Sequence, residues 1–567
     1  MMVGTINKYV SNNYNQLLRR RRAVPAASQI LSCLLALLLK FALTPWMHYN
    51  MKKQGGNIMK KLTVVLIALI ICVSALSACS RAYKYQGLTM GDADYDEIPY
   101  PDFGENIDPE AAKIIENPFV KTSDEPVSTF SADVDTASYS FLRRLITDNY
   151  TYEQIINLGG SSVRTEELVN YFRYSYKLPE KGELFGVDAK LVTCPWNTDS
   201  SLLILGLQTE KPEIKTANNL VFLIDISGSM SSKDKLPLLQ KTFSYLTSNL
   251  GADDTVSIVT YAAGEKVVLE GCEGNKTVLI QNAIDKLKAS GSTNGEAGLK
   301  KAYELAEKYY KPDGNNRIIM ASDGDLNVGI SSVDEVKKFV SEKRDAGVFL
   351  SVLGFGYGNY RDSIMEAVAD NGNGAYYYID CEEEAEKVFG TDLLSTLYTV
   401  AKDVKLQVTF DPGTVSEYRL IGYENRLMTQ QDFEDDTKDA GELGAGHCVT
   451  VCYELKLNNE PEEGADRLFG LSVRYKKPDE DQSLLNEYSF LKSGTAAEAD
   501  ADTDLIAALC ETAMILHDSE FCGDITLKDV LKLLEAHDYS ADGYKQQFVS
   551  LISKLDEISA VKPTQKR

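Results

Sequence analysis

A chain of 567 residues is long enough for several domains, and its 44% of hydrophobic and 25% of charged residues exclude wholesale disorder. The formal net charge is −24, and no Asp or Glu precedes Asp92, so the acidic excess lies entirely in the later part of the chain. Such a surface repels nucleic-acid phosphates and anionic lipid, which argues against a nucleic-acid partner and favours metal ions or basic partners.

The chain begins with two stretches that each combine basic and apolar residues. The second, MKKLTVVLIALIICVSALSACS, has a short basic end and a short apolar core, which is the layout of a bacterial secretion signal. Because one export signal suffices, and because the codons before Met59 can encode a ribosome-binding site, we interpret residues 1–58 as an untranslated upstream extension. Residues 59–78 are then the signal peptide.

The end of this signal, LSAC, resembles the lipobox of bacterial lipoproteins. In that class, cleavage before the cysteine leaves its thiol to carry diacylglycerol, which makes Cys79 the expected lipidation site. The alternatives are an ordinary signal peptide and a membrane anchor. Residues 79–116 are rich in Tyr, Asp, Gly and Pro and are expected to form a flexible tether. The expected location is therefore extracytoplasmic, with the chain lipid-anchored to the bacterial membrane.

The cysteines that follow Cys79 give little support for a zinc or redox site. Their number is odd, no CxxC pair occurs among them, and three histidines accompany them. We expect most of them to be buried as small apolar residues. They are Cys194, Cys272, Cys381, Cys448, Cys452, Cys510 and Cys522.

Residues 216–398 read as an α/β domain. The run Leu220 to Ile224 lacks polar alternation, as in a strand covered on both faces of a parallel sheet. Later apolar runs, such as 348–355, alternate with helical patterns, so we predict a doubly wound, mainly parallel, Rossmann-like sheet. The segment Ala385 to Leu397 is predicted to form its last helix.

Oxygen-bearing side chains follow three elements of this predicted sheet, at the edge where its strands end. Asp225, Ser227 and Ser229 follow the first strand, Thr293 lies in a glycine-flanked loop, and Asp323 follows the strand NRIIMAS. Carboxylates and hydroxyls form a donor set suited to a hard divalent cation. The alternative is a polar turn whose serines cap the next helix.

The motifs DISGS, GSTNG and ASDGD resemble, in order and spacing, the metal-ion-dependent adhesion site of von Willebrand factor type A domains. The resemblance implies that Asp225, Ser227, Ser229, Thr293 and Asp323 hold a divalent cation, with Mg²⁺ expected and Mn²⁺ or Ca²⁺ as alternatives. It also implies a protein partner whose Asp or Glu carboxylate completes the coordination.

Catalysis is not expected, because no histidine lies between His48 and His447 to act as a base beside the ion. The alternatives are a metal-dependent hydrolase that uses Asp325 or Glu296 as base, and a structural component of an envelope assembly. The glycines of GFGYG do not have the spacing of a dinucleotide-binding loop, so no nucleotide is expected.

The flanking segments contain strand-like runs on both sides of the α/β domain. We predict that residues 117–215, which also carry helices, and residues 399–490 together form one β-sandwich into which the α/β domain is inserted. Residues 491–567 are predicted to be helical. The sequences PWN and YRLIGYENR resemble the flanks of a group of bacterial lipoproteins that carry such an A domain.

Overall fold

The computed structural model describes residues 114–561, except 149, 212–215, 293–294, 325–332, 357–361, 459–465, 479 and 481. The described residues belong to the compact unit Tyr100–Arg567. The predicted upstream extension, signal peptide and lipidation site Cys79 lie outside them. Within the described part of the chain, no helix has the length and apolar character needed to cross a bilayer.

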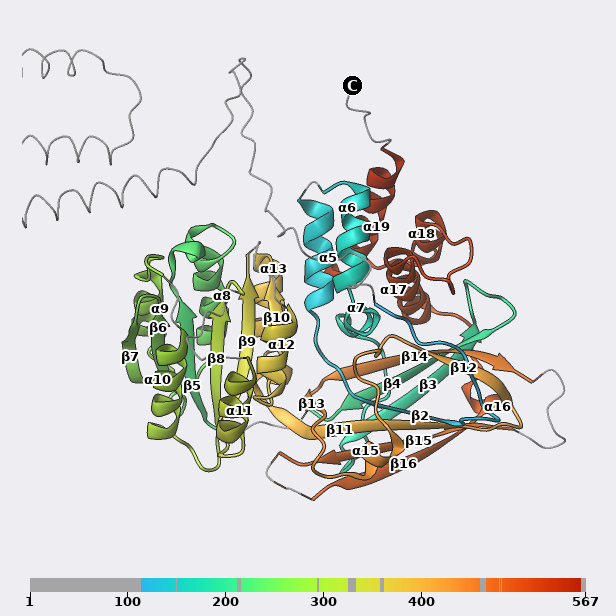
Figure 1. Ribbon diagram of the computed structural model, residues 1–567, viewed down its shortest axis with the longest axis horizontal. Coiled ribbons are helices and arrows are strands. Elements are labelled where there is room, and N and C mark those ends of the chain that lie inside the picture. The colour runs from blue at the N-terminus through green and yellow to red at the C-terminus, as the bar shows by residue number, and fades with distance from the viewer. Residues whose placement is uncertain are drawn as a thin grey trace, which may run out of the picture. The chain divides into compact units, whose positions relative to one another are not determined.

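An α/β domain contains a six-stranded sheet in the order β10-β9-β8-β5-β6-β7 (Figure 1). All its neighbours pair in parallel except β7, which is antiparallel to β6. The predicted doubly wound, mainly parallel sheet is therefore confirmed. Its strands are β5 (Asn218–Asp225), β6 (Thr255–Tyr261), β7 (Glu265–Glu273), β8 (Asn315–Ser322), β9 (Phe349–Phe355) and β10 (Tyr376–Ile379).

Helices cover both faces of this sheet because both faces of its central strand are apolar. In β5, Phe222 packs with α8, α9 and the last helices of the domain, whereas Leu223 packs with α10, α11 and α12. Every residue of β5 is buried. The helices are α8 (Leu236–Ser248), α9 (Thr277–Asp285), α10 (Gly295–Lys308), α11 (Val333–Arg344), α12 (Asp362–Asp370), α13 (Glu382–Glu386) and α14 (Leu393–Leu397).

The last helix of the α/β domain differs from the prediction. It is divided into α13, a π-helical turn Lys387–Thr391 and α14, rather than running unbroken. Ala385, Phe389 and Leu397 are nonetheless buried against the sheet, as their spacing indicated. The π turn adds backbone without displacing these apolar side chains from the core.

The strands before and after the α/β domain form a two-sheet sandwich, as predicted. One sheet has the order β1-β12-β14-β4-β3, and the other has the order β13-β11-β15-β16 with β2 also paired to β11. Strands β3 and β4 precede the α/β domain and pair with strands that follow it, so the domain is an insertion (Figure 1). The bounds are β1 (Val120–Lys121), β2 (Val127–Ser131), β3 (Phe185–Thr193), β4 (Ser201–Thr209), β11 (Thr399–Phe410), β12 (Val415–Ile421), β13 (Gly441–Gly444), β14 (Cys448–Leu457), β15 (Arg467–Lys476) and β16 (Leu484–Leu491).

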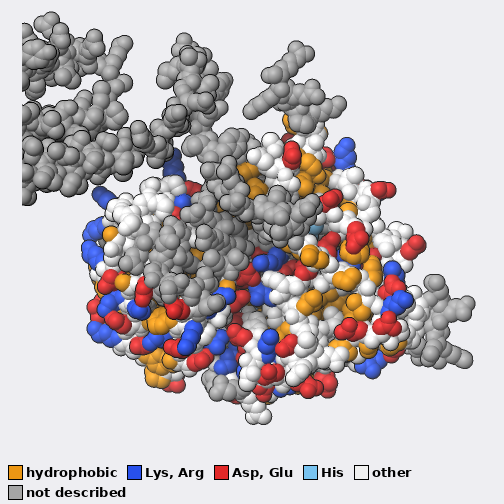
Figure 2. Space-filling model, viewed as in Figure 1, with side chains coloured by type: hydrophobic (Ala, Val, Ile, Leu, Met, Phe, Trp, Pro, Cys, Tyr) orange, Lys and Arg blue, Asp and Glu red, His pale blue; other side chains and the backbone are white. Residues whose placement is uncertain are grey.

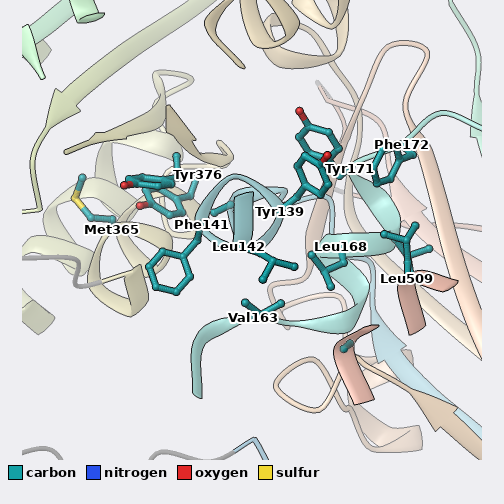
Figure 3. Packing of buried hydrophobic residues seen from close by; sticks show 14 of the residues in the cluster. Tyr139, Phe141, Leu142, Val163, Leu168, Tyr171, Phe172, Met365, Tyr376 and Leu509 are labelled. Atoms are coloured by element: carbon teal, nitrogen blue, oxygen red, sulfur yellow. The ribbon is translucent and has the colours of Figure 1, made fainter. Parts of the chain in front are cut away.

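Helices from both ends of the described chain pack together. Helix α17 contacts α6 and α7, and α19 contacts α5. At their centre the rings of Tyr139 and Tyr171 stack with centroids 3.9 Å apart, and Phe172 meets Tyr139 edge-on (Figure 3). The helices are α5 (Ala137–Thr147), α6 (Tyr152–Ser162), α7 (Thr165–Asn170), α17 (Ala501–His517), α18 (Leu527–Glu535) and α19 (Gly543–Ala560), and two short ones lie elsewhere, α15 (Gln430–Glu434) and α16 (Lys492–Thr495).

Helix α5 also packs against strand β10 of the α/β domain. Figure 3 shows Phe141 of α5 beside Met365 of α12 and Tyr376 of β10, and all three side chains are buried. The amino-terminal segment thus contributes to the core on one side of the inserted domain.

Candidate functional site

The candidate site lies at the carboxyl ends of β5 and β8, which are neighbours in the sheet. Asp225 is the last residue of β5, and Asp323 follows the last residue of β8. The parallel register pairs Ile224 with Ala321, so the two acids leave the sheet at the same edge. This edge is where open α/β sheets bind their ligands.

The turn after β5 brings its oxygen atoms together. Asp225 and Ser227 are buried, and the backbone N–H of Ser227 donates to Asp225 Oδ1 over 2.7 Å. The hydroxyl oxygens of Ser227 and Ser229 lie 2.9 Å apart. Ser229 is exposed, whereas Asp225 is buried. One buried acid and two hydroxyls therefore converge within a single turn.

The glycine-flanked loop expected to carry the next ligand is tied to this turn. The N–H of Ser290 donates to the carbonyl of Ile226 over 2.7 Å, and the N–H of Gly228 donates to the carbonyl of Gly291 over 3.0 Å. Thr293 itself lies outside the described residues. The two backbone hydrogen bonds hold Ser290 and Gly291, the described part of this loop, against the turn after β5.

The serines do not cap the following helix. Helix α8 begins at Leu236, with Lys235 at its N-cap and without a side-chain capping hydrogen bond. The 3₁₀ turn Gly228–Ser231 also lacks a side-chain cap. The alternative interpretation of this stretch as a capping turn is therefore wrong. In the loop before α8, the hydroxyl of Ser232 donates a hydrogen bond to Asp234 over 2.5 Å.

The donor set fits a hard cation. Its carboxylate and hydroxyl oxygens are ligands that Mg²⁺, Mn²⁺ or Ca²⁺ accept, and the described part of the set contains no nitrogen or sulfur that favours zinc. In the described part of the chain, no group of three or more His, Cys, Asp or Glu side chains could hold a metal. A cation site here depends on the two serine hydroxyls as well as on the acids.

The two acids considered as bases take different positions. Glu296 lies in the first turn of α10, and its carboxylate pairs with Lys300 one helical turn later over 2.5 Å. Asp325 lies outside the described residues. Glu296 is therefore an acid on the surface of α10 that forms an ion pair.

Two residues that the sequence did not single out lie beside the site. The ammonium of Lys235 is 2.8 Å from Asp323 Oδ2. Arg144 of α5 pairs with Asp234 and donates to the hydroxyl of Tyr378 over 2.8 Å. Burial would raise the pKa of Asp234, but hydrogen bonds from Ser232 and Arg144 outweigh it and lower that pKa. Sequence spacing gives no signal for either contact, because 88 and 90 residues separate the partners.

The surface of the described residues mixes charges of both signs. On the face shown in Figure 2, acidic and basic side chains are interspersed, so the net negative charge is not gathered there into one patch. Oppositely charged side chains also pair at the surface of the described residues, as Lys308 does with Glu270 and Lys343 with Glu307.

The comparisons with known families divide the chain into three regions. Residues 219–391 match the von Willebrand factor type A domain. Residues 395–558 match the family described as the C-terminal part of uncharacterized protein YfbK, and residues 107–204 match a family described as von Willebrand factor.

The chain is also similar to individual proteins and solved structures. The chain is 36% identical over 472 residues to uncharacterized protein YfbK of Escherichia coli (strain K12), which covers 79% of this chain and 81% of that protein. Inter-alpha-trypsin inhibitor heavy chain H2 of Mus musculus is 29% identical over 147 residues, which are 24% of this chain and 15% of that protein. A solved von Willebrand factor type A structure from Catenulispora acidiphila has a TM-score of 0.38 and 14% identity, and covers 67% of this chain and 91% of its own.

Proposed function

Because the chain belongs to the family of bacterial von Willebrand factor type A proteins with the YfbK architecture, we propose that it binds a protein partner through a divalent cation. The A domain is a module that commonly mediates protein interaction. The cation is held by Asp225, Ser227, Ser229, Thr293 and Asp323. A carboxylate of the partner completes its coordination.

The observation that carries this proposal is the geometry of the turn after β5. Two serine hydroxyls lie 2.9 Å apart in the turn that follows the buried Asp225, and they do not cap a helix. Carboxylate and hydroxyl oxygens gathered at one sheet edge form a donor set that suits a hard divalent cation. Such a cation would balance the charge of the acid and leave a coordination position for an incoming carboxylate.

The protein acts outside the cytoplasm in this proposal. Its lipid anchor is Cys79, and residues 79–116 separate the anchor from the folded unit. The support is the secretion-signal layout of residues 59–78 and the lipobox-like LSAC that ends in Cys79.

The first test is cation binding by the full chain purified in detergent. Isothermal titration with Mg²⁺ and Mn²⁺ should show one site in the wild type and none in Asp225→Ala. A matched control is Asp253→Ala, because Asp253 is exposed and precedes β6 at the opposite edge of the sheet. This control should bind the ion like the wild type.

The second test is capture of a partner from a detergent extract of the cell envelope. The tagged wild type and Asp253→Ala should retain the partner in Mg²⁺ and lose it in EDTA, and Asp225→Ala should not retain it. Equal capture by all three proteins in both conditions would contradict the proposal, because the cation would then have no part in binding.

A further inference from the structure

A lysine side chain lies against the carboxylate of Asp323. Lys235 Nζ is 2.8 Å from Asp323 Oδ2, and the two side chains are 12% and 2% exposed. Both charged groups are therefore largely withdrawn from water. Lys235 is not one of the five residues through which the motif resembles an adhesion site, so the resemblance assigns it no role.

The position of Lys235 depends on a glycine in the loop after β9. A Cβ atom on Gly356 would lie only 2.1 Å from the Lys235 Cε, so the lysine stem crosses the space that a side chain there would fill. Gly356 also has a φ of +77°, which side-chain-bearing residues rarely adopt. Its glycine character thus permits the lysine to reach Asp323.

The backbone next to Lys235 is fixed from two directions. Asp234 accepts from the Ser232 hydroxyl and pairs with Arg144 of α5. The hydroxyl of Tyr378 accepts from Arg144 and donates to the carbonyl of Gly356 over 3.0 Å. One arginine therefore connects to both segments that place the lysine, namely the loop before α8 and the loop after β9.

An ammonium and a divalent cation compete for the same carboxylate oxygen. Both are positive, and their repulsion increases in a site that is shielded from water. A divalent ion that binds Asp323 directly would therefore displace the Lys235 ammonium from its contact with Oδ2. When the ion is absent, the ammonium compensates the buried charge of Asp323, which would otherwise be costly.

We propose that Lys235 is a built-in counter-cation that occupies Asp323 in the ion-free protein and leaves that carboxylate when a divalent ion binds. This inference rests on the proposed function of the same site. It implies that the lysine stabilises the ion-free state and lowers the affinity for the ion. Ion binding is then coupled to movement of the Lys235 ammonium away from Asp323.

The test is the Mn²⁺ dissociation constant of the full chain in detergent, measured by titration and by the paramagnetic resonance of free Mn²⁺. Lys235→Met should bind Mn²⁺ about five- to 150-fold more tightly than the wild type, the usual range for coupling between two binding events. Lys233→Met is the matched control, because Lys233 is exposed on the same loop. Its affinity should stay within about twofold of the wild type.

A second measurement is independent of affinity. In EDTA, Lys235→Met should melt at a lower temperature than the wild type, because Asp323 loses its counter-charge. Added Mn²⁺ should remove this difference. If Lys235→Met does not fold, Lys235→Gln gives the same comparison with a neutral, polar end.

Unchanged or weaker Mn²⁺ binding by Lys235→Met, with normal binding by the wild type, would overturn this inference and leave the proposed function intact. Binding by neither protein would overturn both. Binding by the variant alone would support the inference, since the lysine would then exclude the ion at the concentrations used.

Discussion

Replacing Arg426 should be among the most destabilising single substitutions in the folded unit. Its guanidinium contacts Asp133 over 3.0 Å, Glu366 over 2.9 Å, Asp370 over 3.1 Å and Asp135 over 3.5 Å. Glu366 and Asp370 belong to α12 of the inserted domain, whereas the other two acids follow β2. One cation therefore joins the inserted domain to the sandwich.

The size of the expected stability loss depends on how far the four carboxylates are buried. The side chains of Asp133, Asp135 and Glu366 are 2%, 5% and 8% exposed, and that of Asp370 is 39% exposed. Removing one partner from a buried ion pair costs about 3–5 kcal/mol, because the remaining charge stays out of water. We expect Arg426→Met to lower the free energy of unfolding by that amount near pH 8. Protonation of the carboxylates that lose their partner limits this loss of stability.

The pH dependence has a definite sign. Burial raises the pKa of Glu366 from 4.5 to about 7, although Arg164 and Arg426 oppose the rise. An acid with a raised pKa in the folded state contributes stability that is complete below about pH 4.5 and is lost as pH rises through about 7. Without Arg426 the pKa rises further. The difference between wild type and variant should therefore be smaller at pH 5 than at pH 8.

The assay is urea unfolding followed by far-ultraviolet circular dichroism at pH 5, 6.5 and 8. Arg474→Met is the control, because Arg474 pairs with Asp436, whose side chain is 45% exposed. That variant should lose about 1 kcal/mol or less at every pH. A loss of this small size for Arg426→Met, or a loss that does not change with pH, would refute the reasoning.

Three further predictions concern packing, thiol reactivity and the loop beside the site. Gly374→Ala should lower the free energy of unfolding in urea by about 1–3 kcal/mol or more, because the added Cβ would lie 2.0 Å from the carbonyl oxygen of Leu350. Gly264→Ala should leave it unchanged, because the space around Gly264 is open. Iodoacetamide at pH 8 should modify Cys272 before Cys194 in mass spectra of the native protein, because burial raises the pKa of Cys194 to about 12 and covers its thiol. Arg144→Met should change the Mn²⁺ dissociation constant, measured by titration, at least twofold, because the loop that carries Lys235 loses its ion pair with α5. An unchanged dissociation constant would show that α5 does not influence ion binding.

Much of the fold could be predicted because its signals are local. The unbroken apolar run of β5 indicates a strand covered on both faces, and the alternation of strands and helices indicates a doubly wound sheet. The sandwich could be inferred because strand-like runs on each side of the inserted domain lack enough partners of their own. Each inference required only the chemistry of neighbouring residues.

Other elements were missed because distant contacts determine them. The short β2 carries Ser128, Thr129 and Ser131, which give no apolar alternation, and it becomes a strand by pairing with β11. The sequence predicted a helical tail but not its division into α16, α17, α18 and α19. Between α17 and α18 the chain turns at Asp518 and Gly523, both with positive φ. A run of suitable residues predicts helix, but it does not predict where tertiary packing divides it.

The candidate site likewise contains residues that could be predicted from the sequence and one that could not. Asp225, Ser227 and Ser229 could be proposed because they follow one strand at short spacing, and the structure brings the two hydroxyls together. Whether they bind an ion is still a prediction. Lys235 could not be assigned a role from its position, because its partner Asp323 follows another strand, and Gly356, which leaves room for the lysine stem, lies in a third loop.

The double connection of the inserted domain has a mechanical consequence. The chain enters the domain from β4 and leaves it into β11, and both are interior strands, with β4 between β14 and β3 and β11 between β13 or β2 and β15. Tension applied to the A domain would pass into two strands at once, each held on both sides by backbone hydrogen bonds. Extraction of either strand would require many of these bonds to break together, whereas an edge strand can be peeled away one bond at a time. A partner that pulls on this protein would therefore meet resistance from the sandwich rather than from a single flexible linker.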